Sequence, residues 1–151
     1  MGLFSISEQK VQSHVQTALQ PGEQIQQIVL GTEKPFWTKI FYRVGVFFWS
    51  NYIVATTNQR VVFVEYGGLL SGFKSKRVDA LALGEVDSAS LGWGIFNKNL
   101  TVNAAARRFK RTVEVNRVQR KGNLDNAQAV VGTVQQVRAM GGGAAAPQLH
   151  G

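Results

Sequence analysis

Hydrophobic and polar residues alternate with a period of two in the second half of the chain. In the segment 99–104 every second residue is apolar, and the segment 111–118 repeats the pattern around Val113 and Val115. Such alternation is typical of strands in a sheet with one dry face and one solvated face. The spacers between these strands are too short for helical crossovers, so we expect an antiparallel sheet.

Apolar and β-branched runs predict the remaining strands. The sequence YIVATTNQRVVFVEY predicts a hairpin, because two such runs, 52–56 and 60–66, flank turn residues at 57–59. Asn58 is expected to adopt the positive φ that tight turns need, and Arg60 to bond carbonyls of the turn. We therefore interpret both as structural turn residues. Further strands are expected at 24–30, 75–83 and 86–91.

The pattern changes to a helical period at both ends of the chain. Residues 5–19 are predicted to form a helix, because Ser5 and Glu8 have capping-box spacing and an apolar stripe follows. We favour a helix docked on the domain over a partner-binding helix. A second helix, 124–140, is capped by Asn123 or Asp125, and its apolar face consists of Ala127, Val130, Val131, Val134 and Val137.

These elements divide the chain into three parts. We expect an N-terminal helix and linker at 1–22, a domain at 23–140 that includes the second helix, and a tail at 141–151. The tail, GGGAAAPQLHG, has no period and little to bury, so it is expected to be flexible.

Three segments in order resemble the bacterial pleckstrin-homology-like (PH-like) domains: ALQPGEQI, then VATTNQRVVFVEYGGLLSGFKSKRVDALAL, then GIFNKNLTV. The family's L-x-P-G-E start is similar to residues 19–23, and its T-[DN]-x-R-[LV]-[LV]-F hairpin to residues 57–63. Residues 83–86 fill the family's later step into the last strands. The match covers about residues 18–138, and the succession of motifs carries it rather than any one of them.

The resemblance implies a mainly β fold, α+β by content. We expect a two-sheet, antiparallel, partly open barrel of about seven strands, capped by the C-terminal amphipathic helix, with an additional N-terminal helix. Some members of the family assemble into rings, which the resemblance makes possible without demanding. The chain departs from compact members by inserting an aromatic stretch between the first strand and the hairpin.

That stretch, PFWTKIFYRVGVFFWSNY, is interpreted as a contact surface. A membrane-spanning helix is rejected, because Lys39 and Arg43 interrupt a run that needs about 20 apolar residues. Packing on the barrel or between subunits is favoured over insertion into the head-group layer of a membrane. The candidate membrane or protein contacts are Phe36, Trp37, Lys39, Phe41, Tyr42, Arg43, Phe47, Phe48 and Trp49.

Charge adds a second class of candidate site. The formal net charge of +8 favours anionic partners without choosing among them. Basic clusters at turns are either solvated or able to bind phosphate, and the pattern K-x(n)-[KR]-x-R of phosphoinositide-binding PH domains is absent. The candidate anion contacts are Lys34, Lys74, Lys76, Arg77, Arg107, Arg108, Lys110 and Arg111.

Little in the sequence supports catalysis. His14 and His150 lie near opposite ends of the chain, and there is no cysteine. No catalytic residue, metal ligand or cofactor is therefore assigned, and we expect no enzyme. Our main hypothesis is a scaffolding module that contacts a protein partner or forms a homo-oligomer. A peripheral module on anionic membranes is the alternative, and nucleic-acid binding is disfavoured. The expected location is the cytoplasm, with the inner face of the membrane as the alternative.

Overall fold

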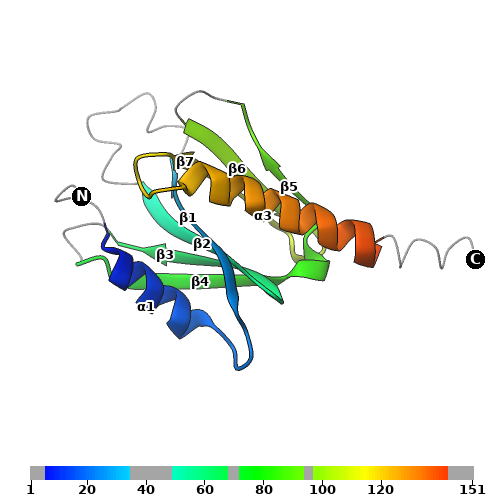
Figure 1. The fold of residues 1–151 in the computed structure, drawn as a ribbon, viewed down its shortest axis with the longest axis horizontal. Helices are drawn as coiled ribbons and strands as arrows, with labels where there is room; N and C mark the ends of the chain where they lie inside the picture. The colour runs from blue at the N-terminus through cyan, green and yellow to red at the C-terminus, as the bar shows by residue number, and fades with distance from the viewer. Residues whose placement is uncertain (1–5, 35–48, 68–71, 94–96, 143–151) are drawn as a thin grey trace, which may run out of the picture.

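The computed structural model describes residues 6–34, 49–67, 72–93 and 97–142. Their order is helix, seven strands, helix, with short helical turns between (Figure 1). The elements are α1 Glu8–Ala18, β1 Ile25–Glu33, β2 Ser50–Thr57, β3 Arg60–Tyr66, β4 Ser75–Ala82, η4 Leu83–Glu85, β5 Ser88–Leu91, β6 Asn97–Ala104, η5 Ala105–Arg107, β7 Phe109–Asn116, α3 Asn123–Val137 and η6 Arg138–Gly142.

The strands form one antiparallel sheet in the order β4-β3-β2-β1-β7-β6-β5. We call β1–β4 the first half and β5–β7 the second half. Among the described residues β4 and β5 do not pair, so the sheet curls over itself without closing. The expected mainly β, antiparallel, partly open barrel with a C-terminal and an N-terminal helix is confirmed. Its two layers are the halves of a single sheet.

The two halves are joined by a narrow seam between β1 and β7. The strands pair only at Thr32 and Glu114. Gly31 permits the close crossing, because a Cβ there would lie 2.8 Å from the Cβ of Val113. Beyond the seam, Asn123 replaces a strand partner: its Oδ1 accepts from Leu30 N at 2.8 Å and its Nδ2 donates to Leu30 O at 2.9 Å. A side chain at the start of α3 thus completes the bonding of β1.

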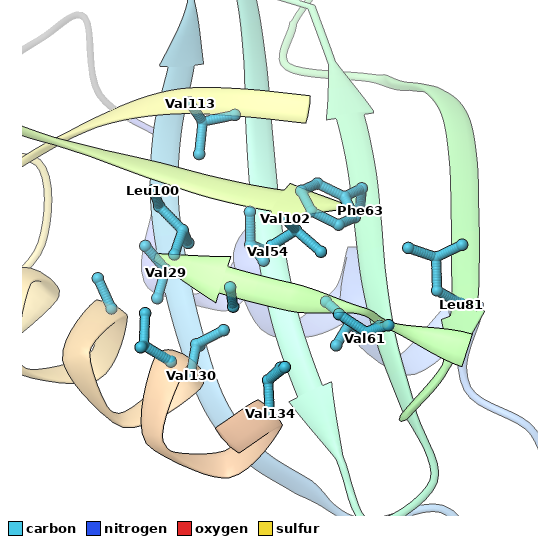
Figure 2. Close-up of a cluster of buried hydrophobic side chains, with 14 of the residues drawn as sticks. Val29, Val54, Val61, Phe63, Leu81, Leu100, Val102, Val113, Val130 and Val134 are labelled. Carbon is cyan, nitrogen blue, oxygen red and sulfur yellow. The ribbon is translucent and has the colours of Figure 1, made fainter. Parts of the chain in front are cut away.

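The main core lies between the halves and beneath α3. Inward side chains from both halves pack together, and Val130 and Val134 of α3 cover them (Figure 2). Valines favour helices weakly, so burial in this core supplies what their intrinsic propensity does not. The predicted apolar face of the helix is confirmed for Ala127, Val130, Val131 and Val134, which are buried. Val137 is partly buried against the same cluster.

A second core lies on the outer face of the first half, where α1 docks. Val11 and Val15 of α1 are fully buried there against outward residues of β1, β2 and β3. This confirms the interpretation of a docked helix. The predicted start is wrong: Ser7 rather than Ser5 caps the helix, accepting a hydrogen bond from Lys10 N at 3.3 Å.

The turn between β2 and β3 is structural, but by contacts other than those expected. Asn58 does not have a positive φ. Its Oδ1 accepts from Gln24 N at 2.9 Å, which fastens the turn to the start of β1. Arg60 reaches beyond the turn: it pairs with both carboxylate oxygens of Glu23 at 2.6 Å and donates to Ala18 O at 2.9 Å. The segments quoted for the family resemblance therefore bind each other.

Candidate functional site

Most of the candidate membrane or protein contacts lie outside the residues that the structure describes. Phe36, Trp37, Lys39, Phe41, Tyr42, Arg43, Phe47 and Phe48 lie outside the described residues, as does the tail from residue 143 onward. Trp49 is described and half-buried. The ammonium of Lys34, just after β1, lies 4.3 Å from the centre of the indole ring of Trp49, just before β2, in a cation–π contact.

Lys34 also belongs to a polar groove beside the seam. Its Nζ lies 2.7 Å from Glu114 Oε1, which in turn accepts from Asn97 Nδ2 at 3.0 Å. The groove opens to a surface cavity of about 330 Å³ lined by Thr32, Glu33, Lys34, Asn99, Lys110, Thr112 and Glu114. Because the ammonium of Lys34 already faces a carboxylate and an aromatic ring, the groove is close to electrically balanced.

Arg111 is not a surface cation. Its side chain is only 13% exposed, and it points inward over the first half from β7. Nη1 lies 2.9 Å from Glu33 Oε2 and also bonds Tyr52 OH, while Nη2 lies 3.5 Å from Asp79 Oδ2. Two carboxylates thus neutralise this guanidinium. Arg111 therefore links β7 to β1 and β4 across the open end of the barrel, and its role as an anion contact stays a prediction.

Burial at the same place affects Tyr52. Removal of its hydroxyl from water raises the pKa of Tyr52 to about 12, although the nearby Arg111 charge opposes that shift. The phenol therefore stays protonated at neutral pH and acts as a hydrogen-bonding group. No signal in the sequence joins Glu33, Tyr52, Asp79 and Arg111, because they come from four different strands.

In the second basic cluster, at the turn between β6 and β7, some cations pair with carboxylates and others do not. Arg107 Nη1 lies 3.2 Å from Glu85 Oε2, so its charge is shared within the protein. Arg108 is exposed at a φ of 50°, the left-handed region that ends the turn. Lys110 is exposed at the rim of the groove. Neither Arg108 nor Lys110 forms an ion pair with another described residue.

The first basic cluster lies at the start of β4. Lys74 and Lys76 are exposed and form no ion pair within the described ranges. Arg77 Nη2 lies 3.1 Å from Asp79 Oδ2, and that carboxylate raises the pKa of Arg77. Lys10 of α1 adds a further cation nearby, since its ammonium bonds Gly72 O and lies 5.7 Å from the ring centre of Phe73.

Most carboxylates of the described chain are used in ion pairs. Each pairs with an arginine or lysine, and the paired acids are Glu8, Glu23, Glu33, Asp79, Glu85, Asp87 and Glu114. Half of the candidate anion contacts, namely Lys34, Arg77, Arg107 and Arg111, take part in these pairs. The net positive charge is therefore spread thinly over separate turns rather than gathered in one described pocket.

The strand β4 is an open edge that the sequence interpretation missed. It pairs with β3 from Ser75 to Ala82, with a register shift at Lys76, and has no partner on its other side within the described chain. Val78, at its centre, is 45% exposed, which is unusual for a valine in a sheet. Exposed strand edges with apolar side chains are sites where another chain adds on.

His14 is engaged in packing: its Nε2 lies 2.6 Å from Phe73 O, and its ring stacks on Tyr66. No cluster of three or more metal-ligating side chains occurs in the described ranges. Within the same ranges, no helix has the length and apolar character required to span a bilayer.

Comparison with known proteins supports the fold. No protein-family model matches the chain, and no curated protein matches it by sequence. A similar solved structure is the hSac2 domain from human phosphoinositide phosphatase Sac2, with a TM-score of 0.52 at 12% sequence identity. The alignment covers 90% of this chain and 85% of that chain. At such low identity the likeness shows a shared fold alone.

Proposed function

We propose that this chain is a non-catalytic, PH-like binding module that acts through protein–protein contacts. The resemblance of its motifs to bacterial PH-like domains supports a binding role. The observation that carries the proposal is the state of the candidate cations. Lys34, Arg107 and Arg111 are engaged with carboxylates of the same chain, while an apolar residue lies exposed on the open β4 edge.

The pairing of these cations with carboxylates favours protein contacts over membrane binding. A basic side chain near an anionic surface adds about 1 kcal/mol only if it is free to approach the lipid phosphates. Cations already paired with carboxylates lose that gain, because the carboxylates are repelled by the same surface. An apolar strand edge gains instead from a protein that supplies matching backbone groups.

Sedimentation velocity on the full chain, over a range of concentrations at physiological salt, tests the proposal. We expect a mass that rises above the monomer with concentration. In parallel, flotation with neutral vesicles and with vesicles containing anionic phospholipid should leave the chain unbound. A chain that stays monomeric throughout and floats only with anionic vesicles, more strongly at low salt, would contradict the proposal.

That last outcome would favour the peripheral membrane module. One observation supports this second candidate: Lys10, Lys74 and Lys76 lie on neighbouring elements at the β3–β4 end, without ion pairs to described residues. Their joint replacement by glutamine should then abolish flotation, and the same replacement should leave sedimentation in the absence of vesicles unchanged.

A further inference from the structure

The hydrogen-bonding direction of β4 follows from its ladder with β3. Leu83 N, just beyond the strand, donates to Gln59 O at 2.9 Å, so the bonded positions of an antiparallel ladder fall on odd residues of β4. Even residues must then direct their N–H and C=O groups to the open edge. Over the regular part of the ladder, from Arg77 to Ala82, the groups available to a further strand are therefore those of Val78 and Ala80, while Lys76 lies at a register shift of the ladder.

The same edge carries a charge pattern that is complementary to itself. Side chains of Arg77 and Asp79 project from one face of β4, on either side of Val78, and form an exposed ion pair of 3.1 Å within the chain, which a second copy would extend into a network of four charges. If a second β4 pairs antiparallel with a two-fold axis at Val78, each Arg77 lies opposite the other copy's Asp79. These are non-hydrogen-bonded pairs, in which the side chains lie closest, at Cα separations of about 4.5 Å.

Neighbouring registers are disfavoured. Moving the two-fold axis by one residue in one direction sets Arg77 opposite Arg77, and moving it in the other direction sets Asp79 opposite Asp79. Like charges directly opposite each other destabilise a strand pair, so charge selects the register centred on Val78. In that register Lys76 lies opposite Ala80 and meets no cation.

The edge is accessible for such pairing. Val78 is 45% exposed and the side chain of Arg77 is 55% exposed. In the centred register the two Val78 side chains meet on the outer face, which removes apolar surface from water. Backbone pairing, apolar contact and reciprocal ion pairs therefore all coincide in one arrangement.

We propose that a second copy of this chain binds at the β4 edge, forming a two-fold dimer whose sheet runs continuously through both copies with Val78 on the axis. This inference rests on the proposed function and names the partner for it. The dimer uses two equivalent Arg77–Asp79 pairs between the copies and the outward backbone groups of Val78 and Ala80.

Sedimentation velocity of purified variants tests the register directly. Val78→Pro removes an N–H that faces the open edge and leaves the β3 ladder intact, so it should weaken dimerisation by about tenfold or more. Arg77→Glu sets two pairs of like charges across the axis and should weaken it by a similar factor. Arg117→Glu, the same change at an exposed residue of the β7–α3 connection, is the matched control and should leave the dimer unchanged.

A mixture of charge variants separates this contact from a general loss of structure. Asp79→Lys alone should also give monomers, because two repulsions between Arg77 and the introduced lysine replace the ion pairs. Equal amounts of Arg77→Glu and Asp79→Lys should form a heterodimer, since every cross-axis pair then joins opposite charges. Asp79→Lys also removes the 3.5 Å contact with Arg111, which keeps its pair with Glu33 at 2.9 Å. Each variant alone should therefore keep the circular dichroism spectrum of the wild type, with a lower melting temperature for Asp79→Lys, and recovery of the dimer in the mixture excludes misfolding as the cause.

The outcomes distinguish this inference from the function on which it rests. A wild-type dimer that survives Val78→Pro and Arg77→Glu, or mixed variants that stay monomeric, would overturn the β4 edge while leaving a protein-contact module in place. A wild-type chain that is monomeric and floats with anionic vesicles would overturn both. A wild-type dimer, together with charge variants that dimerise only in the mixture, would support both.

Discussion

The two halves of the sheet differ in how many of their faces are covered. In the first half, the inner face packs on β5–β7 and α3, and α1 buries the outer face of β1–β3, so β2 and β3 are apolar at consecutive positions. In the second half, only the inner face is buried, and β6 alternates between buried and accessible residues. The same strand architecture therefore has two different sequence patterns, set by one docked helix.

Outward-facing residues of the two halves should therefore contribute differently to the stability of the fold. Ile53 of β2 points outward yet is completely buried by α1. Thr101 of β6 also points outward, but it remains accessible and shares a hydrogen bond of 2.9 Å with Thr112 across the strands. Burial rather than strand position should decide what each contributes to stability.

The largest effect is therefore expected from truncation of Ile53. Ile53→Ala removes a buried side chain and leaves a cavity under α1, and it should lower the free energy of unfolding by about 2–5 kcal/mol. Thr101→Ala, the control on the other half, should lower it by less than about 1 kcal/mol. Urea unfolding followed by tryptophan fluorescence measures both. Equal losses from the two variants would mean that α1 does not protect the outer face.

The same contrast explains how much of the fold was predictable from the sequence. Alternation in the segments 99–104 and 111–118 predicts half-buried strands, and β6 and β7 fall there within two residues. The hairpin strand 60–66 is placed at its observed ends because β-branched runs and turn residues agree. The extension of β1 to Glu33 was not predicted, because Gly31 and Thr32 interrupt the apolar run. Both residues lie where β1 crosses close to β7.

The candidate site was predictable to a lesser extent. A basic turn is visible in the sequence, but the partner of each cation is not, since Glu33 and Arg111 lie 78 residues apart. In the sequence Arg111 resembles its neighbours Arg108 and Lys110. Only its position in β7 distinguishes it, because it lies on the same inward face as Val113. Val78 is likewise indistinguishable from a core valine until the sheet order places β4 at an edge.

The seam gives the next largest prediction, because one side chain there links the two halves. Asn123→Ala leaves both the N–H and the C=O of Leu30 without their buried partner, and it should lower the free energy of unfolding by about 2–4 kcal/mol. Asn126→Ala is the matched control: Ile28 O, to which Asn126 donates, keeps a bond from Arg120 at 3.0 Å. The control should lose about 1 kcal/mol or less. A larger loss from Asn126→Ala would show that β1 is held elsewhere.

The smallest effect is expected from the ion pair between Glu23 and Arg60, which lies within the first half of the sheet. Hydrogen bonds from Arg60 lower the pKa of Glu23 from 4.5 to about 2, against the opposing effect of burial. Because the folded-state pKa is depressed, this stabilisation is complete above pH 4.5 and is lost as the pH falls toward 2. We expect the pair to contribute about 1–2 kcal/mol to the free energy of unfolding at neutral pH, a value reduced by solvent screening at the partly buried Arg60.

Urea unfolding of the wild type and of Glu23→Gln, from pH 7 down to pH 3, measures this contribution. The stability advantage of the wild type should shrink below pH 4.5, and an advantage that stays constant with pH would show that Glu23 titrates as it does in the unfolded chain.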